Sequence, residues 1–389
     1  MDRAPRRAGD ASALRFAYVG TAYPMRGGIA QFNALLAREL AKEHRLHFYS
    51  FSRQYPSIFF PGKTQIESGK DPAPVGARAM VDSIWPWSWI RTANAIARAR
   101  TDVILFKYWI PFFAPCFGTI ARHARRKCGA RTILICDNVI PHEKRLFDTA
   151  LTRYMMNGAD AFVVMSKSVM EDLRRFRPDA PARLVHHPLY THFGEPVPKD
   201  EARRRVGWKS EERVLLFFGY IRRYKGLDLL LRAMPEIHRR TGARLVVLGE
   251  FYENRAPYDR IVQDLGLSAI VQMTGDYVPN EVVGPAFSAG DLVVLPYRSA
   301  TQSGIIQIAT QLERPVLATS VGGLDEMLAD GVTGLLVAPE DQAALVAGVR
   351  RYFDENLEDR LVAGIRKEKS TMGWDSLARA IVELATEGR

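Results

Sequence analysis

Short apolar runs alternate with amphipathic stretches along most of the chain. Residues 29–44 and 169–176 repeat apolar positions every three or four residues, which is the period of a helix packed on a core. The runs between such stretches are rich in Val, Ile, Leu and Phe, as expected for strands that are buried on both faces. The expected strands of the first half are residues 14–20, 45–52, 101–109, 131–138 and 161–168.

The alternation lapses at residues 187–201, where three prolines and a glycine leave no clean period. We interpret this segment as a hinge between two domains. The strand and helix patterns then resume to the end of the chain. The expected strands of the second half are 213–219, 243–250, 270–275, 291–297, 314–320 and 333–339, with helices at 226–239, 258–266, 280–290 and 304–313.

This order of elements predicts an α/β protein with two domains, each built on a mostly parallel sheet. The predicted domains are residues 1–192 and 193–370, and residues 371–389 are expected to form a helix that packs back on the first domain. In such folds ligands bind beyond the carboxyl ends of the strands, and with two domains the natural site is the cleft between them.

Composition places the chain in the ordinary globular range, with 389 residues, 47% apolar and 25% charged. The three cysteines form no C-x-x-C pair, which favours a reducing compartment and argues against a cysteine metal site. No run of 18 apolar residues is present, so no membrane-spanning helix is predicted.

Charge is distributed unevenly between the two halves. Residues 1–200 hold 30 Lys and Arg against 17 Asp and Glu, a net charge of +13, and residues 201–389 hold 24 against 26, a net charge of −2. A cationic first half suits nucleic acid, an anionic membrane or a phosphorylated ligand. Nucleic-acid binding has only this charge in its favour, because no reading motif accompanies it.

A basic cluster follows the expected strand 213–219. The chain contains neither a G-x-G-x-x-G motif after its first strand nor a Walker A lysine, so a plain dinucleotide or NTPase site loses support. Arg222, Arg223 and Lys225 either coat a solvated loop or grip an anion at a helix N-terminus. Arg222 and Lys225 are expected to point the same way, which leaves Arg223 as the expected surface charge.

A second anion site is predicted where the strand 291–297 leads into the next helix. Thr301 and Ser303 are suitable cap residues, and Gly304 and Ile305 open the helix. Two such helix N-termini on adjacent units suit a diphosphate better than a single phosphate.

A glycine pair, Gly27 and Gly28, lies between the first strand and the first helix. Glycine permits positive φ and a close approach of a ligand to the backbone. The pair either makes a tight turn or places its backbone amides against a substrate.

These residues together resemble the retaining nucleotide-sugar glycosyltransferases of glycosyltransferase family 4, also called glycosyl transferases group 1. The resemblance rests on a G-x5-KG block before an apolar helix and on "TQSG", "RPVLATSVGGLDE" and "DGVTGLLV". It covers most of the chain and is most specific in residues 215–345. It implies the GT-B fold, in which two Rossmann-like parallel-sheet domains face each other across a cleft.

The family resemblance also implies the donor chemistry. It assigns a nucleotide-diphosphate sugar, a UDP- or GDP-sugar, as co-substrate and no metal or other cofactor. It assigns the donor diphosphate to Arg222 and Lys225, although the arginine that the family places directly after the glycine is Tyr220 here.

One departure concerns two glutamates, eight residues apart, that the family usually carries around the phosphate-binding turn. Their positions fall on Ala300 and Ile308. Gln302, Ser303 and Gln307 could replace them, because amides and hydroxyls both donate and accept hydrogen bonds. The expected donor-binding residues are Gly28, Arg222, Lys225, Glu250, Gln302, Ser303, Gly304, Ile305 and Gln307.

Glu250 leaves two alternatives open. It follows the strand "LVVLG" and either approaches the sugar or nucleotide or is a surface residue at a strand end.

Polar residues also follow the strand "ILIC" in the first half: Asp137, Asn138, His142 and Glu143. Members of the family often carry a histidine near the position of Asp137, facing the transferred sugar. By this resemblance Asp137 and His142 are the expected catalytic residues, which would orient or deprotonate the acceptor. The alternative is that Asp137 and Asn138 cap a turn. The expected acceptor-binding residues are Gly27, Asn138 and Glu143.

Two aromatic stretches, "IWPWSWIR" and "KYWIPFFAPCFG", lie in the cationic half. Tryptophan and phenylalanine beside arginine suit a membrane interface that carries anionic lipid. The alternative is an ordinary aromatic core beneath a cationic surface.

The sequence thus predicts a retaining glycosyltransferase of the hexosyltransferase type that acts in polysaccharide or glycolipid biosynthesis. Its partners would be a nucleotide-sugar, a glycan or lipid-linked acceptor and an anionic membrane surface, with no nucleic acid. The expected location is the cytoplasm, with peripheral contact to the cytoplasmic membrane face. The alternative function is a non-catalytic GT-B subunit that binds a nucleotide-sugar or a glycan.

Overall fold

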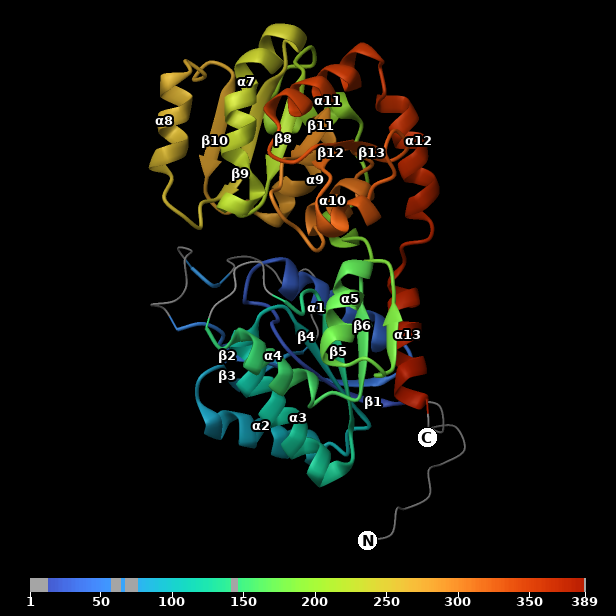
Figure 1. Ribbon diagram of the computed structural model, residues 1–389. Helices are drawn as coiled ribbons and strands as arrows, with labels where there is room; N and C mark the ends of the chain where they lie inside the picture. The colour runs from blue at the N-terminus through green and yellow to red at the C-terminus, as the bar shows by residue number, and fades with distance from the viewer. Residues whose placement is uncertain (1–12, 57–63, 67–75, 141–145, 388–389) are drawn as a thin grey trace. The chain divides into compact units, whose positions relative to one another are not determined.

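The computed structural model describes residues 13–56, 64–66, 76–140 and 146–387. The chain divides into two compact units (Figure 1). The N-terminal unit comprises residues 1–60, 64–186 and 374–389, and the C-terminal unit comprises residues 61–63 and 187–373. Within the described residues, no helix combines the length and the apolar character needed to cross a membrane.

The N-terminal unit is built on a seven-stranded sheet in the order β3-β2-β1-β4-β5-β6-β7, and every pair of neighbouring strands is parallel. Its strands are β1 Arg15–Val19, β2 Arg45–Arg53, β3 Arg78–Asp82, β4 Val103–Tyr108, β5 Arg131–Cys136, β6 Ala161–Val164 and β7 Ala182–Leu184. Its helices are α1 Gly28–Leu40, α2 Pro86–Arg98, η2 Pro111–Phe113, α3 Ala114–Cys128, α4 Asp148–Met156, α5 Lys167–Phe176 and α13 Trp374–Thr386.

The C-terminal unit has a six-stranded parallel sheet in the order β10-β9-β8-β11-β12-β13. Its strands are β8 Val214–Phe218, β9 Arg244–Glu250, β10 Val271–Gly275, β11 Leu292–Leu295, β12 Val316–Thr319 and β13 Gly334–Val337. Its helices are η3 Thr191–Phe193, α6 Lys199–Val206, η4 Arg223–Lys225, α7 Leu227–Thr241, α8 Ala256–Asp264, α9 Asn280–Ala289, α10 Gly304–Gln311, η5 Gly322–Glu326, α11 Gln342–Asp354 and α12 Glu358–Lys369.

The central strands form because both of their faces are covered by helices. All six residues of β4 are buried, as are the four residues of β11, so these segments are continuous apolar runs rather than alternating ones. The order of strands reverses between β1 and β4 in one sheet and between β8 and β11 in the other. Such a reversal opens a crevice at the carboxyl ends of the two strands, where ligands bind in open α/β sheets.

The predicted α/β architecture with two parallel sheets is confirmed. The apolar runs missed β3 and β7, which are short edge strands with few buried residues. The prediction for "KYWIPFFAPCFG" as a membrane interface is wrong, because Phe113 and Phe117 are fully buried and pack on each other with ring centroids 5.5 Å apart. The neighbouring core aromatics are Phe51, Phe106 and Trp109.

The last helix, α13, belongs to the N-terminal unit although the C-terminal unit precedes it in the chain. The Trp374 ring packs edge-on against Phe32 of α1, with centroids 5.0 Å apart. At the other end of α13, Arg131 of β5 donates a hydrogen bond to the Glu387 carbonyl. Helix α13 therefore covers part of a sheet whose strands were completed almost 200 residues earlier in the chain.

The turn after β8 passes close against the loop after β11 at Gly226. Gly226 has φ of 69°, and a Cβ at this position would lie 1.9 Å from the Pro296 carbonyl oxygen. Only glycine satisfies both the left-handed backbone and the close approach. Gly226 is the N-cap of α7, and Gly242 is the C-cap of the same helix. Gly242 has the same φ of 69°, but a Cβ there would meet no atom within 4 Å.

This pair of glycines makes a matched test. Gly242→Ala should cost about 1 kcal/mol for placing a side chain in the left-handed region. Gly226→Ala adds a backbone clash and should cost roughly 2–4 kcal/mol. Urea unfolding of the two variants measures the difference, and equal destabilisation would show that the contact with Pro296 relaxes freely.

Candidate functional site

The basic turn and the start of α10 meet at Gly219, at the carboxyl end of β8. A Cβ on Gly219 would lie 3.0 Å from Lys225 Nζ and 3.3 Å from Ile305 Cδ1. Lys225 ends η4 and Ile305 is the second residue of α10, so the loops after β8 and β11 bring both to the strand-order reversal of this sheet. The Ile305 side chain therefore lies near the Lys225 ammonium, and the N-terminus of α10 that Ile305 helps to open, together with that ammonium, would suit an anion.

Lys225 is buried, with 8% of its surface exposed, and among the described residues no carboxylate forms an ion pair with it. Burial, together with the nearby charge of Arg222, lowers the pKa of Lys225 from 10.5 to about 7. An incoming anion would supply the missing counter-charge and restore the proton at neutral pH.

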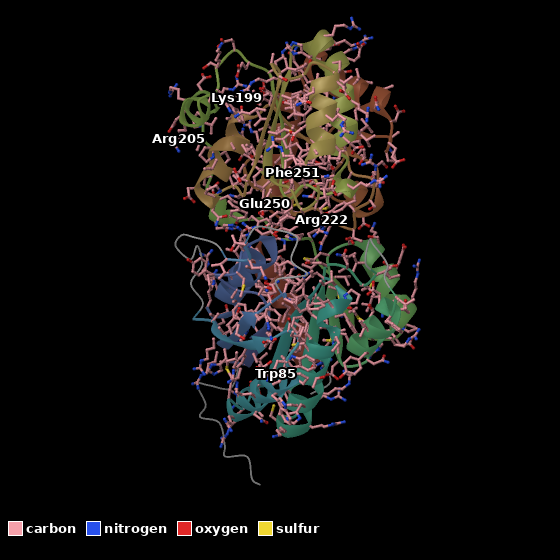
Figure 2. All side chains as sticks on the ribbon, turned by 90° about the vertical axis from the view of Figure 1, so that its left-hand side faces the viewer. Trp85, Lys199, Arg205, Arg222, Glu250 and Phe251 are labelled. Carbon is pink, nitrogen blue, oxygen red and sulfur yellow. The ribbon has the colours of Figure 1, made fainter. Side chains whose placement is uncertain are left out.

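The two arginines of the turn differ as expected. Arg222 is half-buried, and its guanidinium lies 5.4 Å from the centre of the Tyr252 ring. Arg223 is exposed. Figure 2 shows Arg222 and Glu250 close together at one end of the C-terminal unit.

Glu250 is buried rather than a surface residue, with 2% of its surface exposed. Its carbonyl accepts a hydrogen bond from the Ile221 amide at 2.8 Å, and the Gly219 amide donates to the Leu248 carbonyl at 2.9 Å. The end of β9 is therefore fixed against the residues that lead into the basic turn. The surface alternative for Glu250 is excluded.

The start of α10 differs in detail from the prediction. Ser303 is the N-cap residue, but its side chain makes no capping hydrogen bond, and its amide donates to Met327 Sδ at 3.3 Å. Gln307 is buried, and its Oε1 has no hydrogen-bond partner among the described residues. Buried polar atoms are ordinarily bonded, so this oxygen is available to a ligand donor after a small rearrangement.

Ala300 and Ile308, which stand where the family usually has glutamates, are both buried apolar residues with 5% exposure. The remaining predicted donor residues of this loop, Gln302, Gly304 and Ile305, are half-buried. The loop therefore presents amides and backbone, rather than carboxylates, beside Lys225.

The N-terminus of α7 carries an acidic residue of its own, so anion binding there stays a prediction. Its first turn carries Asp228, whose carboxylate pairs with Arg298 through two hydrogen bonds of 2.9 and 2.8 Å. An acidic residue in the first turn already complements the helix dipole. Both predicted helix N-termini lie near Lys225, because Lys225 directly precedes Gly226, the N-cap of α7, and Ile305 of α10 lies near the same Gly219 position.

The predicted catalytic Asp137 lies at the carboxyl end of β5 in the N-terminal unit. Its Oδ1 pairs with Lys107 Nζ at 2.6 Å, and that ammonium lies 3.3 Å from the centre of the Phe32 ring. Burial lowers the pKa of Lys107, and the charge of Asp137 opposes the shift. Asn138 Nδ2 is 3.5 Å from the Trp109 carbonyl oxygen. The Asp137 side chain thus forms an ion pair with Lys107, and the capping of a turn by Asp137 and Asn138 stays an alternative.

The remaining predictions for the N-terminal unit have mixed outcomes. Gly27 is the N-cap of α1, with φ of 107°, and Gly28 is its first residue, so the pair makes a tight turn. Contact of these amides with a substrate stays a prediction. His142 and Glu143 lie outside the described residues.

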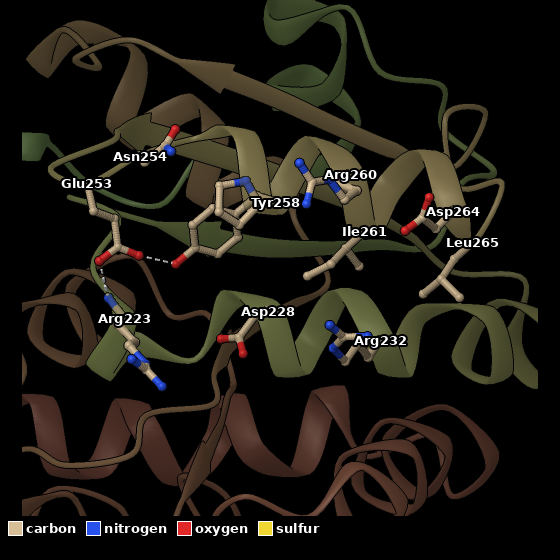
Figure 3. A pocket seen from close by; sticks show the side chains of 11 residues that line it. Arg223, Asp228, Arg232, Glu253, Asn254, Tyr258, Arg260, Ile261, Asp264 and Leu265 are labelled. Atoms are coloured by element: carbon tan, nitrogen blue, oxygen red, sulfur yellow. Dashed lines mark hydrogen bonds between the residues drawn. The ribbon is translucent and has the colours of Figure 1, made fainter.

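A groove of about 530 Å³ lies between α7 and α8 and is lined at one end by Arg223 of the basic turn (Figure 3). Its charged lining alternates in sign, with Arg223, Arg232 and Arg260 against Asp228, Glu253 and Asp264. Lys225 and α10 do not line it. The described residues also contain no group of three or more His, Cys, Asp or Glu side chains placed to hold a metal ion.

Sequence reasoning missed two charged residues beside the predicted ones. Lys107 is the single charged residue in the buried strand β4, and that contradiction with its surroundings was a usable signal. Arg298 lies in a polar loop of ordinary composition, and nothing near it in sequence marks its pairing with a residue 70 positions away.

Two family models match the chain. The model described as Glycosyltransferase Family 4 matches residues 26–193, and the model described as Glycosyl transferases group 1 matches residues 212–355. Together they include the Asp137 and Lys225 sites.

Curated relatives and solved structures agree with these models. The D-inositol 3-phosphate glycosyltransferase of Thermobispora bispora is 31% identical over 327 residues, which are 77% of this chain and 73% of the relative. The D-inositol 3-phosphate glycosyltransferase 1 of Catenulispora acidiphila is 29% identical over 246 residues, so the chain matches 59% of that relative's length. The HepE protein of Anabaena, solved in complex with UDP, matches 95% of this chain and 99% of its own with a TM-score of 0.74 at 14% identity, which shows a shared fold.

We expect Lys225→Met to stabilise the protein at pH 6, with a gain that shrinks as the pH rises. Below pH 7 the folded state holds a buried charge that the unfolded chain exposes to water. Between pH 7 and the unfolded value of 10.5, only the unfolded chain takes up the proton, so the cost declines across this window. The cost below pH 7 is on the order of a few kcal/mol.

Urea unfolding at pH 6, 7.5 and 9 measures this difference. The control is Lys209→Met, which removes an exposed lysine from the same unit and should change stability equally at all three pH values. A gain for Lys225→Met that does not depend on pH would contradict the burial of an unpaired ammonium.

Proposed function

This chain belongs to glycosyltransferase family 4, and on that premise we propose that it transfers a hexosyl group from a nucleotide-diphosphate sugar to a glycan or lipid-linked acceptor, with retention of anomeric configuration. The observation that carries the proposal is that Lys225 Nζ and the side chain of Ile305, the second residue of α10, converge on Gly219. A diphosphate carries two adjacent anionic groups, and this position offers two adjacent sources of positive potential.

In the proposed reaction the bond between the anomeric carbon and the diphosphate oxygen breaks, and negative charge develops on the departing diphosphate. Lys225, Arg222 and the amides of α10 would stabilise that charge without a metal ion. The acceptor hydroxyl oxygen forms the new glycosidic bond to the anomeric carbon, and its proton passes to an oxygen of the departing diphosphate. Gln302, Ser303, Gln307 and Glu250 are the residues we assign to sugar or ribose hydroxyls, and the unpartnered Gln307 Oε1 supports this assignment.

The acceptor side is assigned to the N-terminal unit. Asp137 is held by Lys107, which fixes the direction of its carboxylate and compensates its charge. A carboxylate in this state suits orientation of a hydroxyl or of developing positive charge better than strong basic catalysis. Gly27 and Asn138, which we assign to the acceptor, follow the central strands of the same sheet, at the edge where ligands of such sheets bind, and Gly28 beside them stays assigned to the donor.

A non-catalytic nucleotide-sugar-binding subunit is the alternative, and the apolar Ala300 and Ile308 favour it. Donor binding without transfer or hydrolysis would identify this case. The same measurement with a panel of UDP- and GDP-sugars identifies the donor.

Membrane contact is a separate part of the proposal. Trp85 and Trp87, at the start of α2, are 57% and 72% exposed, and Ile84 beside them is 45% exposed. Figure 2 shows Trp85 on the side of the N-terminal unit that faces the viewer. Exposed tryptophan in a unit with excess positive charge suits peripheral attachment to anionic lipid at the cytoplasmic membrane face. A lipid-linked acceptor would be within reach of an enzyme held there.

The diphosphate assignment predicts that Lys225→Ala weakens UDP or GDP binding roughly 10- to 100-fold, the range expected for one charge-assisted hydrogen bond. Arg223→Ala removes an exposed charge two residues away and should change affinity by less than about twofold. Isothermal titration calorimetry measures both. Equal effects of the two substitutions would assign binding to the general charge of the turn rather than to Lys225.

The membrane proposal predicts that the double substitution Trp85→Ser/Trp87→Ser reduces co-sedimentation with phosphatidylglycerol vesicles by at least roughly tenfold. The matched control is Leu265→Ser/Val282→Ser, which removes two residues that are 40% and 38% exposed in the C-terminal unit. Vesicles of phosphatidylcholine alone should bind the unmodified protein weakly. Unchanged co-sedimentation of the tryptophan variant would exclude α2 as the attachment point.

A further inference from the structure

Arg298 joins the turn that carries Lys225 to the loop that leads into α10. The Arg298 amide donates to the Tyr224 carbonyl at 2.7 Å, and its Nη1 donates to the Arg223 carbonyl at 2.7 Å. Tyr224 and Arg223 are the two residues before Lys225 in η4. Arg298 follows β11 by three residues, so it couples the two loops that meet at Gly219.

The Arg298 side chain is itself held in one geometry. Its Nη1 and Nη2 donate to the two carboxylate oxygens of Asp228 at 2.9 and 2.8 Å, and its Nε lies 3.2 Å from Glu340 Oε1. Burial opposes ionisation of Asp228, but the hydrogen bonds and charge of Arg298 prevail and lower its pKa. Because the planar guanidinium of Arg298 bonds to a carboxylate on each of two edges, the direction of the side chain is fixed. A lysine at the same position would not fix it.

The opposite side of the turn is fixed by a second carboxylate. The Arg223 amide donates to Glu253 Oε2 at 2.8 Å, and Glu253 also accepts a hydrogen bond from the Tyr258 hydroxyl (Figure 3). The short turn before Lys225 is therefore bonded through its Arg223 amide on one side and its Arg223 and Tyr224 carbonyls on the other.

We propose that Arg298 is a positioning residue. It holds Lys225 Nζ near the first turn of α10 so that the ammonium and the helix N-terminus can bind the same diphosphate. This role rests on the proposed function, because it names a residue that acts through Lys225 on the same ligand. Lys225 has no carboxylate of its own in the described part of the chain, so its place depends on the backbone that carries it.

The same unit contains a matched ion pair with no such role. Arg244 pairs with Glu212 through its Nε and Nη2, both at 2.9 Å from Oε2, and its side chain is 19% exposed against 22% for Arg298. Arg244 is the first residue of β9, so it lies at the amino-end edge of the sheet, opposite the Gly219 site. Arg244→Gln therefore reports what the loss of an equivalent ion pair does to stability alone.

The test is a double-substitution cycle measured by calorimetric titration with UDP. We expect Arg298→Gln to weaken UDP binding about tenfold in the unmodified protein and less than about twofold in a Lys225→Met background. Arg298→Lys keeps the positive charge but loses the planar guanidinium. It should weaken UDP binding by less than Arg298→Gln does and by more than no substitution. Arg244→Gln should lower the melting temperature as Arg298→Gln does but leave UDP affinity within about twofold.

Equal effects of Arg298→Gln with and without Lys225 would overturn the proposal, as would a loss of affinity in Arg244→Gln that matches its loss of stability.

A readout without ligand separates this inference from the proposed function. The pH at which Lys225 titrates, measured from the pH dependence of the stability change that Lys225→Met causes, should rise when Arg298→Gln loosens the turn. An unchanged titration refutes the positioning role even if UDP does not bind, whereas failure of UDP to bind with a shifted titration refutes only the proposed donor.

Discussion

A buried ammonium without a paired carboxylate, Lys225, is the constraint on which the candidate site depends. Removing such a charge from water is expensive unless another group compensates it, so the pKa of Lys225 falls towards neutrality. Here Gly219 leaves room for the side chain, and Gly226 allows the backbone to pass against Pro296. The Arg298 and Glu253 hydrogen bonds fix the turn between them. The result is a lysine whose pKa is lowered before any ligand arrives and whose proton an incoming anion would restore.

The N-terminal unit contains a second buried lysine that shows the contrast. Lys107 is also beyond the reach of water, but it pairs with Asp137 and lies over the Phe32 ring. Its charge is therefore already compensated, and its effect is to hold a carboxylate at the end of β5. Lys225 thus leaves its charge for an anionic ligand to compensate, whereas Lys107 holds the Asp137 carboxylate in place.

The sequence was sufficient for the elements that follow from local pattern. Apolar runs located the central strands, and the spacing of Gly219, Arg222 and Lys225 located the basic turn with the correct exposed arginine. It was insufficient where a contact joins distant positions. Asp228 and Arg298 are 70 residues apart, and Lys107 and Asp137 are 30 residues apart. Neither ion pair can therefore be predicted from the local pattern of apolar and polar residues. The same reason explains why one aromatic stretch was assigned to a membrane: residues 107–118 have the composition of an interface, and only the packing of α3 on the sheet shows that they are core.

Helix α13 has a consequence for how the protein is made. The N-terminal unit lacks this helix until residues 374–386 leave the ribosome, although its strands have all emerged by residue 184. At the usual pace of about 5–20 residues per second, the delay is roughly 10–40 seconds. During that interval the surface of α1 that receives Trp374 stays uncovered while the C-terminal unit is synthesised. The first unit to begin folding is thus the last to be finished, and a nascent chain that stalls late would carry one complete unit and one with an open apolar face.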